Sequence, residues 1–218
     1  MNKTGSLAIC ELYESIQGET SLSGIPTSFI RLAGCPLRCH WCDSDFTYTS
    51  ATQLSFKEIF KTLQQFGWPH VCVTGGEPLF QTATIPFLQE LSQKHYVISL
   101  ETNGAFPIKE IPPSIKIILD IKCPKSGMTE HNFWENLSII QPKDEIKCVI
   151  ADRTDYEWAI DVIQKHQLIE KKIPILFSTV WEQLDPKILT EWIIADKLNV
   201  RLNIQIHKYI WHPTTRGV

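Results

Sequence analysis

The chain has 218 residues, a length that predicts one domain spanning residues 1–218, because domains usually hold roughly 100 to 200 residues. Hydrophobic residues make up 43% of the sequence and charged residues 21%, a composition that excludes global disorder. The net charge is −3, so we expect neither nucleic acid nor a membrane surface as a partner, since both attract basic proteins.

The cysteines and the apolar segments indicate the compartment. No apolar run approaches the roughly 18 to 20 residues that cross a bilayer, and the first residues lack the basic and apolar pattern of a signal peptide. The seven cysteines are an odd set in which only Cys35, Cys39 and Cys42 cluster, so a disulfide scaffold is not expected. We therefore expect a reduced, cytoplasmic protein.

Strand and helix patterns alternate along the chain. Runs rich in β-branched residues predict strands at 7–13, 27–32, 71–74, 97–101, 116–120, 145–150, 173–179 and 201–206. Amphipathic patterns predict helices at 56–66, 85–95, 156–167 and 186–198, the first after a capping box formed by Ser55 and Glu58. Alternation of this kind predicts a mostly parallel sheet with right-handed crossovers.

Polar residues follow several predicted strands at their carboxyl ends. These residues are Thr74-Gly75-Gly76-Glu77, Glu101-Thr102-Asn103, Asp120 with Lys122, Ser178-Thr179, and Gln205 with His207. Parallel barrels carry their active sites at this rim, and open sheets do so at a switch point. Because a full barrel usually takes roughly 250 residues, the chain favours an α/β fold of the partial, incomplete parallel β/α barrel type.

Three cysteines lie close together in the segment Cys35-Pro36-Leu37-Arg38-Cys39-His40-Trp41-Cys42. One interpretation is a structural zinc site with His40 or a distant residue as fourth ligand, although such sites commonly use two separated pairs of ligands. The other is a [4Fe-4S] cluster with three thiolate ligands and one open iron that binds a small molecule. The spacing favours the cluster and leaves zinc open.

The cysteine pattern, with Trp41 before its last member and Gly75-Gly76-Glu77-Pro78 downstream, resembles the radical S-adenosylmethionine (SAM) enzymes. Within that superfamily, residues from about 11 to 213 resemble the 7-carboxy-7-deazaguanine synthase family. The segments that carry this resemblance are Ser15-Ile16-Gln17-Gly18-Glu19, Arg31-Leu32-Ala33-Gly34-Cys35, Cys42-Asp43-Ser44, Thr74-Gly75-Gly76-Glu77-Pro78, Glu101-Thr102-Asn103-Gly104 and Gln205-Ile206-His207-Lys208-Tyr209.

The resemblance implies a lyase of queuosine and 7-deazapurine biosynthesis. Its reaction would be the SAM- and Mg²⁺-dependent radical ring contraction of 6-carboxy-5,6,7,8-tetrahydropterin to 7-carboxy-7-deazaguanine, with release of ammonia. The resemblance implies that the cluster and SAM generate the radical that removes a hydrogen atom from the substrate, and that the protein orients these cofactors. The implied partners are this pterin substrate, a flavodoxin or ferredoxin that donates electrons, and a second copy of the chain in a homodimer.

The resemblance also implies a role for individual residues. The cluster ligands would be Cys35, Cys39 and Cys42, and the Mg²⁺ ligand would be Ser44, where the family usually has threonine. The SAM-binding residues would be Trp41, Cys42, Asp43, Gly76, Asp120, Ile121, Lys122, Ser178 and Thr179. The substrate-binding residues would be Ile16, Gln17, Gly18, Arg31, Thr74 and Pro213.

Two alternatives come from other functional classes. The family commonly has Ser-Pro-Lys where this chain has Asp120-Ile121-Lys122. The sequence Asp-Ile-Lys is also familiar from enzymes that activate glycyl-radical proteins, which makes such an activase one alternative. The segment Gln17-Gly18-Glu19 argues against it. A zinc-stabilised binding module is the non-enzymatic alternative, and stoichiometric zinc without iron or sulfide would identify it.

Overall fold

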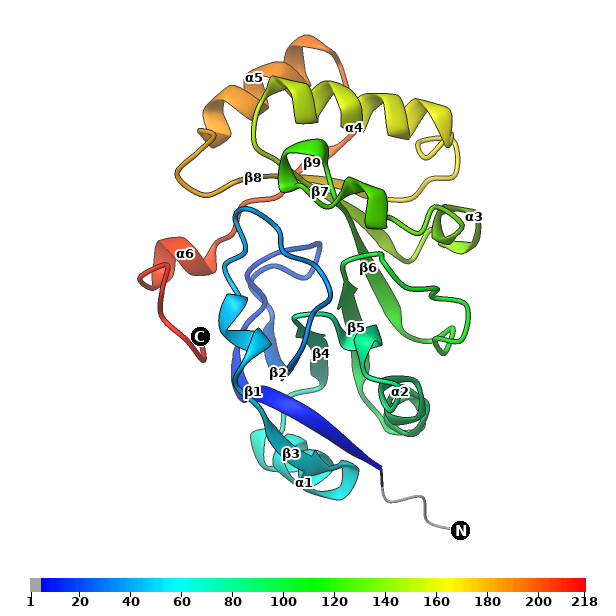
Figure 1. Ribbon diagram of the computed structural model, residues 1–218, viewed down its shortest axis with the longest axis vertical. Helices are drawn as coiled ribbons and strands as arrows, with labels where there is room; N and C mark the ends of the chain where they lie inside the picture. The colour runs from blue at the N-terminus through cyan, green and yellow to red at the C-terminus, as the bar shows by residue number, and fades with distance from the viewer. Residues whose placement is uncertain (1–4) are drawn as a thin grey trace.

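The computed structural model describes residues 5–218, which form one nine-stranded sheet in the order β3-β1-β2-β4-β5-β6-β7-β8-β9 (Figure 1). The strands are β1 (Ser6–Ile16), β2 (Pro26–Leu32), β3 (Thr52–Ser55), β4 (His70–Gly75), β5 (Val97–Thr102), β6 (Lys116–Ile121), β7 (Glu145–Ile150), β8 (Ile175–Thr179) and β9 (Arg201–Leu202). The helices are α1 (Phe56–Phe66), α2 (Thr84–Ser92), α3 (Asn136–Ile139), α4 (Arg153–Lys165), α5 (Pro186–Ala195) and α6 (His207–Ile210). Short 3₁₀ helices are η1 (Asp45–Tyr48), η2 (Pro78–Phe80), η3 (Pro124–Ser126) and η4 (Thr129–His131).

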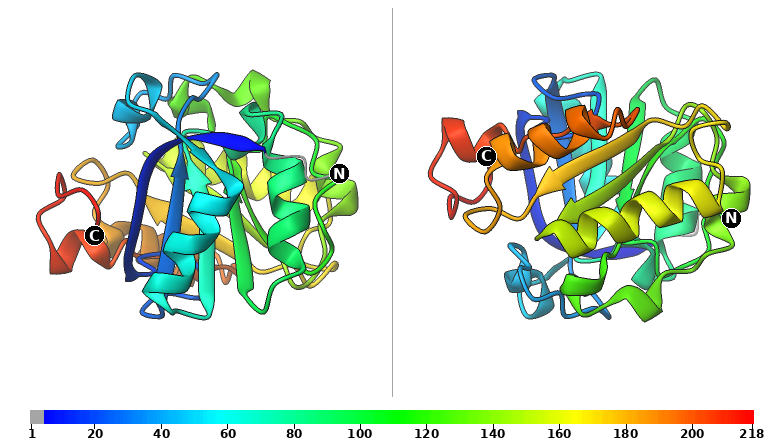
Figure 2. Two further views of the ribbon diagram at one scale, coloured as in Figure 1. Left: turned by 90° about the horizontal axis from the view of Figure 1, so that it is seen from below. Right: turned by 90° about the horizontal axis from the view of Figure 1, so that it is seen from above.

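The sheet is parallel from β2 through β4 to β9, and β1 is antiparallel to both of its neighbours. Among residues 5–218 no pairing joins β3 to β9, so the curved sheet stays open and the predicted partial barrel is confirmed. Figure 2 shows α1, α2, α4 and α5 packed against the outside of this curved sheet. The register sets Arg31 beside Thr74 and Asp120 beside Lys147, which brings polar side chains of neighbouring strands together.

The hydrophobic core fills the space between the sheet and the outer helices. Phe87 of α2 meets Phe56 and Phe60 of α1, with ring centroids 5.2 and 5.4 Å apart. The predicted capping box is present, because the Ser55 side chain accepts a hydrogen bond from the Glu58 backbone and the Glu58 carboxylate accepts one from the Ser55 backbone. Local capping therefore fixes where α1 begins, and aromatic burial fixes which face it presents to the sheet.

The end of the sheet differs from the prediction. The strand expected at 201–206 stops at Leu202, and the next residues turn into α6. The cause is Asn203, whose side chain accepts a hydrogen bond from the Thr20 backbone at 2.8 Å and donates one to Ser178 Oγ at 2.8 Å. These bonds hold the chain against the β1–β2 loop, so the strand cannot continue. Sequence reasoning also missed the short strand β3, which pairs with β1.

Within residues 5–218, none of the helices combines the length and the apolar character that crossing a membrane requires.

Candidate active site

A cavity of about 880 Å³ opens at the carboxyl ends of the parallel strands. Nearly all of the predicted site residues line it, namely Ile16, Gln17, Gly18, Arg31, Cys35, Cys39, Trp41, Cys42, Asp43, Ser44, Thr74, Gly76, Asp120, Lys122, Thr179 and Pro213. The side chains of Ile121 and Ser178 do not. Because side chains alternate along a strand, Asp120 and Lys122 face the cavity while Ile121 joins the hydrophobic core.

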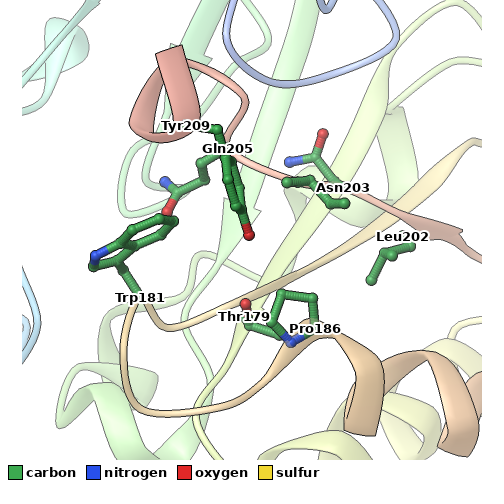
Figure 3. A pocket seen from close by; sticks show the side chains of 8 residues that line it. Thr179, Trp181, Pro186, Leu202, Asn203, Gln205 and Tyr209 are labelled. Atoms are coloured by element: carbon green, nitrogen blue, oxygen red, sulfur yellow. The ribbon is translucent and has the colours of Figure 1, made fainter. Parts of the chain in front are cut away.

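A second pocket adjoins this cavity between β8, the start of α5 and the segment before α6 (Figure 3). Thr179, Trp181 and Gln205 belong to both spaces, and the other residues that line the smaller one are Pro186, Leu202, Asn203, Ile204 and Tyr209. Its volume is about 10 Å³, which is room for roughly one water molecule. The large cavity is therefore the candidate active site.

The cysteine loop runs from β2 to η1 and presents all three of its sulfur-bearing side chains to the cavity. The Cys42 backbone donates to the Cys39 carbonyl at 3.2 Å, and the buried Leu37 anchors the loop. His40 does not line the cavity, since its Nδ1 lies 2.9 Å from the Lys125 carbonyl. The proposed fourth zinc ligand is thus turned toward η3.

Within residues 5–218, no three His, Cys, Asp or Glu side chains converge closely enough to hold a single metal ion. A [4Fe-4S] cluster does not require such convergence, because each thiolate binds a different iron of the cluster. Three half-buried cysteines spread along one wall of a cavity fit this group. The donor chemistry and the geometry of the loop therefore suit a cluster better than a mononuclear zinc site.

The glycine turn after β4 packs directly against the cysteine loop. Gly75 has a φ of +149°, and a Cβ at Gly76 would lie 2.4 Å from the Gly34 carbonyl oxygen and 2.9 Å from Cys35 Cβ. The Glu77 backbone donates to the same Gly34 carbonyl at 2.8 Å. Only glycine permits this approach, so the turn and the cysteine loop form one wall of the cavity.

Glu77 was not predicted as a site residue, yet it joins the ends of β4 and β5. Its fully buried carboxylate accepts hydrogen bonds from the Leu79 backbone at 2.8 Å, Thr102 Oγ1 at 2.9 Å and the Asn103 backbone at 2.7 Å. Burial raises the pKa of Glu77 to about 7, although the three donors oppose the shift. An acidic residue inside a glycine turn was the sequence signal that could have identified it.

A second wall of the cavity carries the residues predicted to bind substrate. Gln17 Nε2 donates to Glu101 Oε1 at 3.1 Å, and Thr74 Oγ1 donates to Glu101 Oε2 at 3.1 Å. Burial raises the pKa of Glu101, and the Lys147 charge opposes this shift. The structure thus brings Gln17 and Thr74 together through a carboxylate that can still accept hydrogen bonds from a ligand.

Arg31 is held by two residues of β1. Its Nε lies 2.8 Å from Glu11 Oε2, and its terminal nitrogen donates to the Tyr13 hydroxyl at 2.8 Å. Burial works to lower the pKa of Arg31, but Tyr13 and Glu11 more than offset it, so the pKa lies above its usual value. Arg31 is therefore a fixed cation in the cavity, partly neutralised by Glu11.

Three further ion pairs line the cavity. Lys147 of β7 pairs with Glu19, Lys122 pairs with Asp120 at 3.1 Å, and Lys208 of α6 pairs with Asp43 at 2.9 Å; Gln205 also donates to Glu19. Burial works to lower the pKa of Lys147, but Glu19 and its neighbours raise it above its usual value. Lys147 was not predicted, and its position as a lone cation in the apolar strand EIKCVI was the available signal.

The predicted Mg²⁺ ligand lies at the end of the cysteine loop. Ser44 Oγ donates to Asp43 Oδ1 at 3.0 Å. Burial works to raise the pKa of Asp43, but Lys208, Lys147 and the Ser44 hydrogen bond together lower it to about 2. Mg²⁺ prefers hard oxygen ligands and keeps several waters, so one hydroxyl with an adjacent carboxylate fits this ion when a ligand supplies further oxygens.

The C-terminal segment 212–218 completes the cavity. Pro213 lies in this segment, and the Arg216 guanidinium lies 3.8 Å from the centroid of the Phe46 ring. In residues 5–218 no carboxylate comes within ion-pair distance of Arg216. The rim of the cavity thus carries an exposed cation without a counter-charge.

Comparison with known proteins identifies the family of the chain. Residues 29–122 match the model of the Radical SAM superfamily. The chain is 42% identical over 221 residues to the 7-carboxy-7-deazaguanine synthase of Chlorobaculum tepidum, with 100% of both chains covered. It is 40% identical over 226 residues to that of Koribacter versatilis, with 97% of this chain and 100% of the relative covered.

The structure also resembles the crystal structure of QueE from Escherichia coli, with a TM-score of 0.73 at 24% identity over 91% of this chain and 93% of that one. This likeness shows a shared fold. The family follows from the full-length sequence identity to the two synthases. The chain therefore belongs to the 7-carboxy-7-deazaguanine synthase family of the radical SAM superfamily.

Proposed function

We propose that the chain converts 6-carboxy-5,6,7,8-tetrahydropterin to 7-carboxy-7-deazaguanine with release of ammonia. The observation that carries this proposal is one cavity of about 880 Å³ that holds the cysteine loop, the glycine turn and the group formed by Gln17, Thr74 and Glu101. Membership of the family supports the choice of substrate. When bound, a [4Fe-4S] cluster and SAM supply the one-electron chemistry that removes a hydrogen atom from the substrate.

The wall formed by the cysteine loop and the glycine turn would hold the cofactors. Cys35, Cys39 and Cys42 would bind three irons and leave the fourth open to SAM. Gly76 exposes backbone to the cavity, and the pair of Lys122 with Asp120 offers a cation and a hydrogen-bond acceptor in the same cavity. Trp41, Asp43 and Thr179 would complete this site, and Ile121 and Ser178 could contribute to it only through their backbone.

The other wall would orient the substrate. The amide edge of a pterin presents N–H donors side by side, and the Glu101 carboxylate, already held by Gln17 and Thr74, is placed to accept from them. The substrate carboxylate requires a cation, and Arg31 provides one whose direction is fixed by Glu11 and Tyr13. Ser44 with Mg²⁺ would hold the oxygens of the same substrate.

Several wider properties belong to the same proposal. The chain would act as a single radical SAM domain in the cytoplasm, form a homodimer and receive electrons from a flavodoxin or ferredoxin. The exposed Arg38 side chain of the cysteine loop supports docking of an acidic donor. Reduction by flavodoxin that does not slow with rising salt would contradict an electrostatic contact.

The test is an anaerobic incubation of reconstituted protein with the pterin, SAM, Mg²⁺ and dithionite, followed by mass spectrometry. We expect 7-carboxy-7-deazaguanine from the wild type and from Cys10→Ala, a matched control outside the loop, and none from Cys39→Ala. Formation of 5′-deoxyadenosine without 7-carboxy-7-deazaguanine would show that the pterin is not the substrate. A glycyl-radical activase would then be the alternative. Stoichiometric zinc without iron or sulfide would replace the proposal with a binding module.

A further inference from the structure

Two of the three cysteines in the loop receive hydrogen bonds from side chains outside it. Asn103, after β5, donates from Nδ2 to Cys35 Sγ at 3.5 Å. Tyr48, at the end of η1, donates from its hydroxyl to Cys42 Sγ at 3.3 Å. Among residues 5–218, no side chain donates a hydrogen bond to the Cys39 sulfur. Among these residues, the sulfurs of Cys35 and Cys42 therefore each have a side-chain hydrogen-bond donor that the sulfur of Cys39 lacks.

The orientation of the Asn103 side chain is fixed by its other contacts. Its Oδ1 accepts a hydrogen bond from the Ala105 backbone at 3.0 Å, which leaves the amide nitrogen to face the sulfur. Its own backbone donates to the buried Glu77 carboxylate at 2.7 Å, and the residue is 8% exposed. These two contacts direct one amide N–H at Cys35.

Tyr48 is held in a comparable way at the other end of the loop. The guanidinium of Arg38, a residue of the cysteine loop, lies 4.0 Å from the centroid of its ring, and this cation–π contact holds the Tyr48 side chain against the loop. A phenol keeps its proton at neutral pH, so the hydroxyl acts as the donor toward a thiolate. Removal of this hydroxyl alone would leave the stacking with Arg38 in place.

We propose that Asn103 and Tyr48 are positioning residues that raise the reduction potential of the cluster by donating hydrogen bonds to the sulfurs of Cys35 and Cys42. Reduction adds negative charge to the cluster and its thiolates, and a donor stabilises the more negative state. Hydrogen bonds to the sulfurs are among the factors that set the potentials of iron–sulfur clusters. This inference rests on the proposed function, because it requires a cluster on these cysteines.

The test is an anaerobic redox titration of the reconstituted full chain without substrate, followed by electron paramagnetic resonance, with iron and sulfide counted for every sample. The variants are Tyr48→Phe, which removes one hydroxyl, Asn103→Ala and the double variant. Tyr96→Phe is the matched control, because it makes the same chemical change at a tyrosine outside the cavity.

We expect both single variants to keep the iron of the wild type and to be reduced less readily. The ratio of reduced to oxidised cluster at a fixed potential should fall roughly three- to tenfold, and tenfold corresponds to about 59 mV for one electron. The double variant is expected to shift further than either single variant, and Tyr96→Phe is expected to show no shift. Unchanged or raised potentials in iron-replete Tyr48→Phe and Asn103→Ala would overturn the inference. Wild-type protein that binds no iron under reconstitution would instead overturn the proposed function.

Discussion

Replacement of Gly76 by alanine tests the packing of the glycine turn on the cysteine loop. The new Cβ would lie 2.4 Å from the Gly34 carbonyl oxygen and 2.8 Å from the Gly34 carbonyl carbon, both of them backbone atoms that cannot rotate away. Overpacking of this kind costs about 1 to 3 kcal/mol. The displacement would also move Cys35, since Gly34 precedes it in the chain, so we expect Gly76→Ala to lose stability and cluster occupancy together.

Gly67→Ala is the matched control. Gly67 ends α1 with a φ of +75°, and a Cβ there would meet no atom within 4 Å. Its cost is confined to the left-handed backbone, about 1 to 2 kcal/mol, and iron content should equal that of the wild type. Denaturant unfolding and iron and sulfide analysis after reconstitution measure both effects. Wild-type iron content and SAM binding in Gly76→Ala would refute the reasoning.

Three further predictions follow from the charges in and around the cavity. The folded-state pKa of Glu77 is about 7 against an ordinary 4.5, so its contribution to stability is complete below pH 4.5 and is lost as the pH rises through 7. The stability of Glu77→Gln relative to wild type should therefore improve from pH 4.5 to 8, by on the order of 3 kcal/mol in denaturant titrations. A stability difference that does not change with pH would contradict the raised pKa. Lys147→Met removes the partner of the largely buried Glu19 and should cost about 3 to 5 kcal/mol of unfolding free energy; a loss below about 1 kcal/mol would show that the pair is solvated. Arg216→Ala removes an exposed cation at the rim and should raise the KM for the pterin roughly two- to fivefold with kcat unchanged, whereas a fall in kcat alone would argue against a binding role.

Local sequence patterns were sufficient for much of the fold. The Ser55–Glu58 capping box fixed the start of α1, and the order of strands and helices implied the parallel sheet. The cysteine loop and the glycine turn were recognisable because each is a contiguous segment with its own backbone requirements. Parallel strands then bring such segments to one rim, so their meeting in one cavity followed from the fold class.

Those local patterns do not predict contacts between segments that are distant in the sequence. The pairing of Lys147 with Glu19 joins residues 128 positions apart, and the bond from Asn103 to Cys35 spans 68. The last strand was overestimated because its β-branched residues favour a strand, whereas the Asn203 side chain holds the chain against Thr20 and ends it. Tertiary hydrogen bonds decided both features, and no local propensity reports them.

The most direct test of the proposed site is an anaerobic crystal structure of the reconstituted protein with SAM, Mg²⁺ and 6-carboxytetrahydropterin. We predict a cluster on Cys35, Cys39 and Cys42, with the pterin in the same cavity against Glu101 and Arg31. A cluster with a fourth ligand from the protein, or a pterin bound outside this cavity, would contradict the assignment.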